Sequence, residues 1–403
     1  MLTRRFYSSA KNLPKIQHWK ICDVLSNEDA LELEYSLEGK SKNVIIPFVW
    51  LRDHCSSTKY YNYPTNQRKS KCLNILEESL VKKLNVGTDN LEIKWKDGHV
   101  STFDIKTLLE KCIKAKFVKS NFISLWDNTL EDIPRSDSKF LKFSEFAENL
   151  VRYGVVIVNG VKQTAEDTEE LCKSLVPFHD TFFGQFWTFS NASNEESVTH
   201  EDTAYGNEEI GPHTDGTYFD QTPGIQVFHC LQPAETGGDT ILVDGFNCAE
   251  ILRSKSPEYF SILANFRISH HYLEGNPPGS SIHSLSAEKP VIELDSQGNL
   301  KQIRFNPYDR APFDCLASAD GAAKALQFYK AYEEFSRICH DPANSVRFSL
   351  TPGSVIFIDN HRVLHARTQF YGTRKMCGCY LSRDNFYAKA RPFLVENCRR
   401  HIE

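Results

Sequence analysis

The chain lacks an apolar run long enough to span a bilayer, and it lacks an excess of positive charge. A spanning helix needs about 20 consecutive apolar residues, whereas the richest apolar stretch, Val155 to Val158, has the length of a strand. A formal net charge of −5 provides no basic field to hold nucleic acid or an anionic membrane. We therefore expect no nucleic acid and no membrane among its partners.

The chain also lacks the dense cysteine spacing of a small disulfide-bonded domain, although it has 12 cysteines in 403 residues. Only Cys377 and Cys379 stand close together in the sequence. A chain of this length buries a sizeable core without cross-links. We expect most of the cysteines to be buried as small hydrophobic residues.

No acidic residue occurs before Asp23. The preceding segment has serines and basic residues but no continuous apolar stretch, and this composition is typical of a mitochondrial transit peptide. Its basic residues are Arg4, Arg5, Lys11, Lys15 and Lys20. We expect residues 1–15 to be such a leader and the mature protein to reside in the mitochondrial matrix.

Short strands dominate residues 16–115, which predict a small β-rich N-terminal domain. Val44–Trp50 is interpreted as one strand and Leu91–Trp95 as another. The Asp-Gly dipeptide that follows the second strand predicts a hairpin turn, because Asp-Gly tolerates positive φ. Residues 116–140, which mix charges with a proline, are expected to form a linker.

Residues 141–403 predict a second, larger domain. A helix over Phe143–Tyr153 precedes the apolar strand at Val155. Further along, short strands alternate with glycine and proline turns, and helices are expected at Ala249–Arg253 and Ala322–Cys339. This rhythm is typical of a double-stranded β-helix, or jelly roll. The predicted fold class is mainly β with flanking helices: a jelly-roll catalytic domain preceded by the small β-rich domain.

A candidate metal site begins with His213 and Asp215, which are separated by one residue. Side chains at i and i+2 of a strand point to the same face, so both could reach one ion. A third ligand, His365, follows the apolar strand Val355–Ile358. Two imidazoles and a carboxylate leave three positions open on a metal, as non-heme Fe(II) oxygenases require. A His-X-Asp triplet alone is common by chance, so the surrounding sequence has to decide.

Two further residues suit a dicarboxylate cosubstrate. Arg374 follows His365 on the next expected strand, and a guanidinium can donate two parallel hydrogen bonds to a carboxylate. Thr240 could donate its hydroxyl to the same carboxylate. Taken singly, each could equally be a surface or turn residue, but beside three metal ligands a binding role is favoured.

Several long motifs resemble the γ-butyrobetaine and trimethyllysine dioxygenases of carnitine synthesis. The resemblance covers nearly the whole chain after the leader. The motifs that carry it are His213-Thr214-Asp215-Gly216-Thr217-Tyr218-Phe219, Gly224–Cys230, Leu242–Phe246, Ile303–Asn306, Tyr308-Asp309-Arg310, Arg362–Arg367 and, nearer the N-terminus, Trp50–Cys55.

The resemblance implies a small N-terminal β domain followed by a double-stranded β-helix. It implies that Fe(II) binds His213, Asp215 and His365, and that the cosubstrate 2-oxoglutarate binds Arg374. We expect O2 as the other cosubstrate and ascorbate as the reductant. The reaction would convert 2-oxoglutarate to succinate and CO2 while a small molecule is hydroxylated. The family also suggests a homodimer.

The resemblance further implies an aromatic cage for a trimethylammonium group. Such a group has no N–H to donate and therefore suits aromatic faces. Phe183, Trp187, Tyr205 and Tyr380 match the cage positions, although the family usually has Tyr at the position of Phe183. That substitution keeps the ring and removes a hydroxyl. Ordinary core packing is the alternative for each ring.

Three residues favour Nε-trimethyllysine over γ-butyrobetaine as the substrate. Asp202 could pair with the α-ammonium that only trimethyllysine carries, whereas butyrobetaine enzymes have Asn at the matching position. Gly216 leaves space for a longer chain, and Asn306 could hold the amino-acid end. The predicted reaction gives 3-hydroxy-Nε-trimethyllysine, the first step of carnitine biosynthesis. Turn capping by Asp202 and a loop hydrogen bond from Asn306 are the structural alternatives.

Other functions remain open at this point. γ-Butyrobetaine hydroxylation, the last step of carnitine biosynthesis, is the nearest alternative. A dioxygenase of the same fold that acts on sulfonates or carboxylates would present cations to its substrate. A non-catalytic jelly-roll protein would bind a ligand without the chemistry.

Related N-terminal domains hold zinc with clustered cysteines and a histidine. Cys55 and His99 match two of these ligands, but Ser57 and Tyr60 stand where thiols are needed. Cys72 could be recruited only if the intervening loop folds back. Since a structural zinc site requires four ligands, we expect no zinc in this domain.

Overall fold

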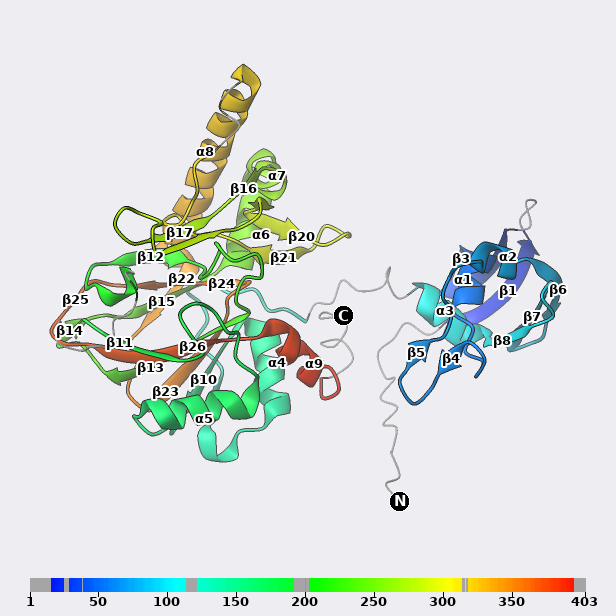
Figure 1. Ribbon diagram of the computed structural model, residues 1–403, viewed down its shortest axis with the longest axis horizontal. Helices are drawn as coiled ribbons and strands as arrows, with labels where there is room; N and C mark the ends of the chain where they lie inside the picture. The colour runs from blue at the N-terminus through cyan, green and yellow to red at the C-terminus, as the bar shows by residue number, and fades with distance from the viewer. Residues whose placement is uncertain are drawn as a thin grey trace. The chain divides into compact units, whose positions relative to one another are not determined.

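The computed structural model describes residues 16–24, 29–37, 39–113, 122–191, 200, 203–313, 316 and 318–394. The chain divides into two compact units, Met1–Lys119 and Ser120–Glu403 (Figure 1). Each unit has its own hydrophobic core. The predicted leader, residues 1–15, lies outside the described residues. The predicted domain boundaries at 115 and 140 stay predictions.

The first unit contains two three-stranded antiparallel sheets. One sheet has the order β1 (Ile16–Val24), β2 (Ala30–Leu37), β3 (Lys40–Pro47), and the other β6 (Val81–Val86), β7 (Asn90–Trp95), β8 (Val100–Asp104). The remaining elements are α1 (Phe48–Asp53), β4 (Tyr61–Asn62), β5 (Gln67–Arg68), α2 (Ile75–Glu78) and α3 (Ile105–Ile113).

The alternation of apolar and polar residues in β7 explains the second sheet. Leu91, Ile93 and Trp95 are fully buried, whereas the residues between them are exposed. The following turn contains Gly98 at φ +85°, a conformation that glycine adopts without steric cost. The predicted strand and hairpin are thus confirmed.

The predicted strand Val44–Trp50 is only partly correct. β3 ends at Pro47, and Phe48 begins the short helix α1. Proline has no N–H to donate to a strand ladder, which is tolerated here because β3 is an edge strand, and Pro47 is also the N-cap of α1. The helix also buries the side chains of Phe48 and Leu51 in the core of the first unit.

The second unit is built on two larger sheets. The six-stranded sheet has the order β11 (Trp187–Ser190), β26 (Lys375–Leu381), β13 (Ile225–Gln232), β23 (Ser354–Asp359), β10 (Val155–Asn159), β9 (Arg135–Asp137). The four-stranded sheet has the order β12 (Ile210–His213), β24 (Val363–Arg367), β15 (Thr240–Asp244), β22 (Ser345–Phe348). Neighbouring strands are often distant in sequence, so each sheet brings together residues far apart in the chain.

Four shorter strand pairs and three 3-10 helices, one of them η5 (Pro342–Asn344), are also found among the described residues of the second unit. The others are β14 (Thr236–Gly237) with β25 (Phe370–Tyr371), β16 (Arg267–Ile268) with β19 (Lys289–Pro290), β17 (His271–Glu274) with β18 (Ile282–Leu285), β20 (Ile292–Leu294) with β21 (Leu300–Ile303), η2 (Ser138–Phe140) and η3 (Thr203–Tyr205).

The uninterrupted apolar run of β10 is explained by burial on both faces. Val156 and Val158 pack against the helical layer, whereas Val155 and Ile157 belong to the core that includes Leu242 of the four-stranded sheet. A strand covered on both faces needs apolar residues at consecutive positions. The two sheets therefore enclose a core of their own.

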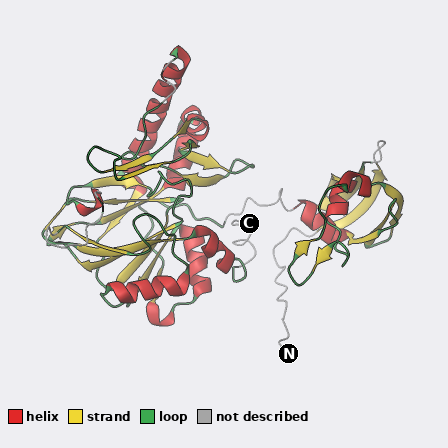
Figure 2. Cartoon of the chain, in the orientation of Figure 1, coloured by secondary structure: helices red, strands yellow, loops and turns green. Residues whose placement is uncertain are grey.

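Helices cover the outer faces of both sheets (Figure 2). On the six-stranded sheet they are α4 (Phe143–Tyr153), α5 (Ala165–Leu175) and α9 (Arg383–Ala390). On the four-stranded sheet they are α6 (Gly245–Lys255), α7 (Pro257–Asn265) and α8 (Ala319–His340). The predicted helices at 143–153, 249–253 and 322–339 are confirmed, and the last two extend further than expected.

A buried ion pair fastens the segment expected to be a linker. Arg362 donates to Asp244 over 2.7 Å and to the carbonyl oxygen of Ser124 over 2.7 Å. Trp126, from the same segment, is buried and its main-chain N–H donates to Asp244. Residues 122–140 therefore pack as part of the second unit.

Nine cysteines fall within the described residues, none of them in a disulfide. Seven are buried, as expected, while Cys72 is exposed and Cys112 is partly buried. Across the same described ranges, no helix combines the length and apolar character that a bilayer span demands.

Candidate active site

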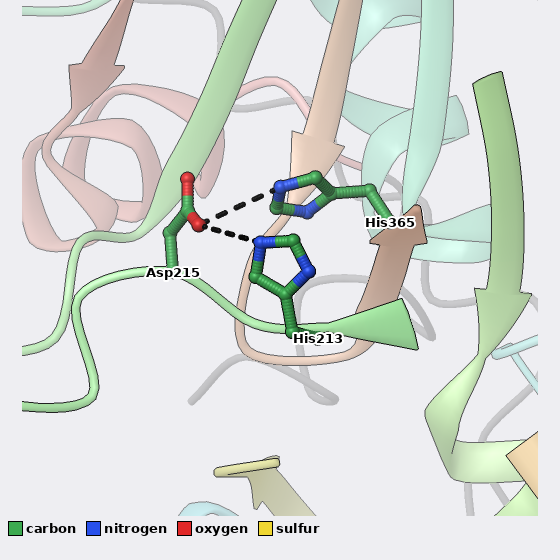
Figure 3. Close-up of side chains that lie close together, drawn as sticks. All are labelled: His213, Asp215 and His365. Atoms are coloured by element: carbon green, nitrogen blue, oxygen red, sulfur yellow. Dashed lines mark ion pairs between the residues drawn. The ribbon is translucent and has the colours of Figure 1, made fainter. Parts of the chain in front are cut away.

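Two histidines from neighbouring strands face each other at the edge of the four-stranded sheet. His213 ends β12 and lies opposite His365 of β24 in the strand register, with ring centroids 4.4 Å apart. The Oδ1 atom of Asp215 lies 3.2 Å from Nε2 of His213 and 3.5 Å from Nε2 of His365 (Figure 3). One ligand atom from each residue lies within 4.8 Å of the others, so the three side chains could hold one metal ion.

Asp215 does not share a strand with His213, contrary to the sequence interpretation. β12 ends at His213, and Asp215 lies in the following turn. The side chain of Asn360 holds this turn: its Oδ1 accepts from the N–H of Asp215 over 2.8 Å, and its Nδ2 donates to the carbonyl of Asp215 over 2.9 Å. The same Nδ2 donates to the carbonyl of Pro223. Asn360 is fully buried, and sequence reasoning missed it.

The hydrogen bonds of the triad prepare it for a cation. Nδ1 of His213 lies 2.9 Å from the carbonyl oxygen of Gly211; since a carbonyl only accepts, Nδ1 carries the proton and Nε2 keeps its lone pair. Burial alone would raise the pKa of Asp215, but His365, His213 and the hydroxyl of Tyr380 lower it to about 2. The site thus offers a carboxylate and two imidazole nitrogens, a donor set that fits Fe(II).

A cavity of about 370 Å³ opens beside the triad. Asp202 lies outside the described residues, so its place in the site stays a prediction. Every other residue predicted for the site lines this cavity: His213, Asp215, His365, Arg374, Thr240, Phe183, Trp187, Tyr205, Tyr380 and Asn306.

Arg374 provides a cation in the cavity wall. Its main-chain N–H donates to Asn191, and within the described ranges no hydrogen bond or ion pair engages its guanidinium. The guanidinium carbon lies 5.6 Å from the ring centre of Phe370. Burial lowers the pKa of Arg374, yet a guanidinium stays charged at neutral pH. Such a group is suited to an anionic ligand in this cavity.

The four aromatic residues predicted for the cage have different ring neighbours. Trp187 and Tyr380 contact each other, with ring centroids 4.8 Å apart. Tyr205 instead packs edge-on against Phe189, and Phe183 contacts the ring of Tyr272. All four predicted rings nevertheless face the same cavity.

Tyr380 has a second contact that its aromatic character did not predict. Its hydroxyl donates to Oδ2 of Asp215 over 3.0 Å. The oxygen of Asp215 that faces the two histidines is the other one, Oδ1. Tyr380 therefore links the aromatic wall to the metal-binding carboxylate.

Comparisons with known proteins decide the family. A model described as "Taurine catabolism dioxygenase TauD, TfdA family" matches residues 129–380. A second, "Gamma-butyrobetaine hydroxylase-like, N-terminal", matches residues 23–109. The chain belongs to the TauD, TfdA dioxygenase family. The predicted fold class is confirmed, and iron and 2-oxoglutarate agree with this family and with the triad.

The similarity to other proteins extends over both units of this dioxygenase. A mouse protein named "Trimethyllysine dioxygenase, mitochondrial" is 34% identical over 92% of this chain and 87% of its own length. A Meyerozyma guilliermondii "Trimethyllysine dioxygenase" is 30% identical over 94% of this chain and 96% of its own. A Pongo abelii "Gamma-butyrobetaine dioxygenase" is 27% identical over 90% and 95%. The resemblance found in the sequence motifs is confirmed.

Arg367 is a further residue of the dioxygenase site that sequence reasoning did not single out. It lines the cavity, and its guanidinium donates to the carbonyl oxygens of Ala204, Gly206 and Glu208 over 3.0, 2.8 and 2.7 Å. These three carbonyls belong to the segment that carries Tyr205. Arg367 therefore fixes that segment against β24.

The first unit of the dioxygenase contains a second cluster with a histidine. Sγ of Cys55 lies 3.3 Å from Nε2 of His99, and Oγ of Ser57 lies 3.5 Å from the same nitrogen. The hydroxyl of Ser101 donates to Cys55 over 3.0 Å. Ser57 thus stands where a thiol was needed, and the expectation of no zinc stays a prediction.

Proposed function

We propose that this dioxygenase hydroxylates Nε-trimethyllysine to 3-hydroxy-Nε-trimethyllysine, the first step of carnitine biosynthesis. The observation that carries the proposal is the 34% identity, over 92% of this chain, to a relative named trimethyllysine dioxygenase. The relative named for γ-butyrobetaine is 27% identical. Succinate and CO2 are the expected coproducts.

His213, Asp215 and His365 would hold Fe(II). With 2-oxoglutarate and O2, the bound iron supplies the oxidising power for hydroxylation of a C–H bond. Arg374 would bind the distal carboxylate of 2-oxoglutarate, and Thr240 would donate its hydroxyl to the same group. The protein itself orients the two substrates and excludes water from the cavity.

The trimethylammonium group would bind against aromatic rings. Trp187 and Tyr380 lie together next to Asp215, so a cation on their faces would lie near the metal ligands. Phe183 and Tyr205 line the same cavity. A quaternary ammonium is attracted to these electron-rich faces and has no hydrogen to donate elsewhere.

The proposal also covers the location of the protein, its reductant and its oligomeric state. We expect the mature protein in the mitochondrial matrix, in agreement with the basic leader and with the word "mitochondrial" in the mouse relative's name. We also expect ascorbate to sustain turnover by keeping the iron reduced, and a homodimer in solution. Analytical ultracentrifugation of the full chain tests the dimer.

A substrate panel tests the reaction directly. The purified full chain is incubated with Fe(II), ascorbate and 2-oxoglutarate, and O2 consumption is followed with trimethyllysine, γ-butyrobetaine or taurine. We expect trimethyllysine to give the fastest coupled turnover and a product that has gained one oxygen atom by mass spectrometry. Faster turnover of γ-butyrobetaine would assign the sister reaction instead, and fastest turnover of taurine would move the substrate class to sulfonates.

A further inference from the structure

We propose that Tyr380 is a positioning residue for the metal ligand Asp215: its hydroxyl holds Oδ2, so that Asp215 binds the metal through Oδ1 alone. The ring of Tyr380 lines the cavity, where the proposed function gives it a place in the wall for the trimethylammonium group. The role of its hydroxyl rests on the metal triad and does not depend on the identity of the substrate.

The two carboxylate oxygens of Asp215 have different neighbours. Oδ1 lies 3.2 Å from Nε2 of His213 and 3.5 Å from Nε2 of His365, so it lies where the two imidazole nitrogens converge. Oδ2 instead accepts the hydroxyl hydrogen of Tyr380 over 3.0 Å. The carboxylate therefore has one oxygen directed to a cation and the other bound to a phenol.

Contacts other than Asp215 hold Tyr380 in place. Its strand, β26, pairs with β13, and Gln226 lies opposite Tyr380 in the register. The main-chain carbonyl of Tyr380 accepts from the N–H of His179 over 2.9 Å. Tyr380 is 5% exposed, and its ring contacts that of Trp187. Sheet pairing and ring packing thus fix the hydroxyl before a metal binds.

The main chain of Asp215 is held on the opposite side of the residue. The buried side chain of Asn360 bonds both its N–H and its carbonyl, over 2.8 and 2.9 Å. Because the main chain is held, Asp215 can present Oδ2 to a cation mainly by rotating its carboxylate. That rotation requires the bond to Tyr380 to break.

The number of open metal positions makes this restraint important. The iron needs three of them, two for 2-oxoglutarate and one for O2. Both oxygens of a carboxylate can bind one metal ion, and a second bond from Asp215 would occupy one of the three positions. The hydrogen bond from Tyr380 competes with that second bond. A phenol suits this role because it donates a hydrogen without placing a charge beside the metal.

A count of the water molecules on bound Mn(II) tests the inference without substrate. Full-length protein is loaded with Mn(II), and the broadening of its electron paramagnetic resonance lines in water enriched in oxygen-17 gives the number of bound waters. We expect three in the unmodified protein and two in Tyr380→Phe, which keeps the ring and frees Oδ2. Addition of 2-oxoglutarate should then leave one water in the unmodified protein and none in the variant.

Tyr205→Phe is the matched control. It removes a phenol hydroxyl from the same cavity, at a ring that packs edge-on against Phe189, and it should keep all three waters. Three waters in Tyr380→Phe would overturn the inference. Two waters in the unmodified protein would also overturn it, and this measurement stands even if Tyr380→Phe does not fold.

Calorimetric titration of the unmodified protein, loaded with Mn(II) and 2-oxoglutarate, with trimethyllysine separates the inference from the proposed function. If trimethyllysine does not bind while the water counts are three and two, the proposed function is contradicted and the role of the hydroxyl is supported. If trimethyllysine binds while Tyr380→Phe keeps three waters, only the inference about the hydroxyl fails.

Discussion

Two clusters among the described residues, one in each unit, match the positions at which related proteins hold a metal. In the second unit, both Nε2 atoms of His213 and His365 face one oxygen of Asp215. In the first unit, His99 faces Cys55 and Ser57. The cluster of the second unit has three strong ligands at the wall of a cavity, whereas the cluster of the first unit has two ligands and a hydroxyl.

Because of this difference, we expect only the cluster of the second unit to bind a metal. The Cys55 sulfur accepts from Ser101 and lies within contact of His99, so the polar atoms of that cluster satisfy one another. At the triad, the protonated Nδ1 of His213 is bound to Gly211, and its Nε2 is directed at the carboxylate. The number of ligands and the direction of their lone pairs distinguish the two clusters.

The largest effect is expected from removing the carboxylate of the triad. Asp215→Ala leaves two neutral imidazoles, which bind Fe(II) weakly, so hydroxylation should fall to background and bound metal should be lost. His99→Ala in the other cluster is the matched control and should leave turnover unchanged. Coupled succinate formation and metal content by mass spectrometry measure both effects. Retained activity in Asp215→Ala would remove this residue from the metal site.

The next largest effect is expected from replacing Arg374, which provides a positive charge in the cavity wall. Arg374→Ala should raise the KM for 2-oxoglutarate by about tenfold to a hundredfold, because two hydrogen bonds to a charged group are lost. Arg374→Lys retains the charge without the two-pronged geometry and should lie between Ala and the unmodified protein. Initial rates at varied 2-oxoglutarate give these constants. An unchanged KM in both variants would show that the cosubstrate binds elsewhere.

Replacing Asn360, which holds the main chain at Asp215, should have a smaller effect. Asn360→Ala removes three hydrogen bonds around the turn that carries Asp215, and loss of such outer contacts typically weakens metal binding by about tenfold to a hundredfold. The dissociation constant of Mn(II), measured by electron paramagnetic resonance, is the readout. Asn265→Ala, which loses only bonds to Ser261 within α7, is the control. Equal Mn(II) affinity in the two variants would reduce Asn360 to a structural role.

The sequence singled out the candidate ligands, which the structure brings together at one cavity, but it did not indicate the residues that hold them in place. His365 and Arg374 were singled out because their side chains suit a metal and a dicarboxylate and because they follow an apolar strand and a family motif. Asn360 and Arg367 act on main-chain groups that approach them only after the sheets have formed. Their identity alone contains no signal of those partners.

The same limit applies to local structure. The periodicity of β7 and the burial of β10 follow from side-chain pattern, whereas the end of β3 at Pro47 depends on burial of Phe48 in the core of the first unit. An apolar run before a helix cannot be distinguished from a longer strand by pattern alone.

His229, a buried histidine that belongs to neither cluster, should make the stability of the protein depend on pH. His229 lies between the hydroxyl of Thr168 and the N–H of Gly353, and burial lowers its pKa to about 4. The unfolded chain binds this proton near pH 6.5. Unfolding therefore takes up a proton between about pH 6.5 and 4, and the free energy of unfolding falls as the pH decreases through this window.

At pH 5.5, the low pKa of His229 should lower the free energy of unfolding by about 1 kcal/mol. His229→Gln should make the decline in unfolding free energy between pH 6.5 and 4.5 shallower, as measured by urea titrations. His340→Gln, at an exposed position near the end of α8, should leave the slope unchanged. Identical slopes in His229→Gln and the unmodified protein would mean that this histidine does not titrate with unfolding.

The smallest effect is expected at the cluster of the first unit, where we predict no stoichiometric zinc. Elemental analysis of protein purified without added metal should give substoichiometric zinc, and a chelator should leave the melting temperature of the first unit unchanged. If no zinc binds, His99→Ala should cost only about 1 kcal/mol, the value of the one hydrogen bond between its ring and Cys55. One zinc per chain that persists in Asp215→Ala but is lost in His99→Ala would show that the cluster of the first unit binds zinc, and the contrast between the two clusters would disappear.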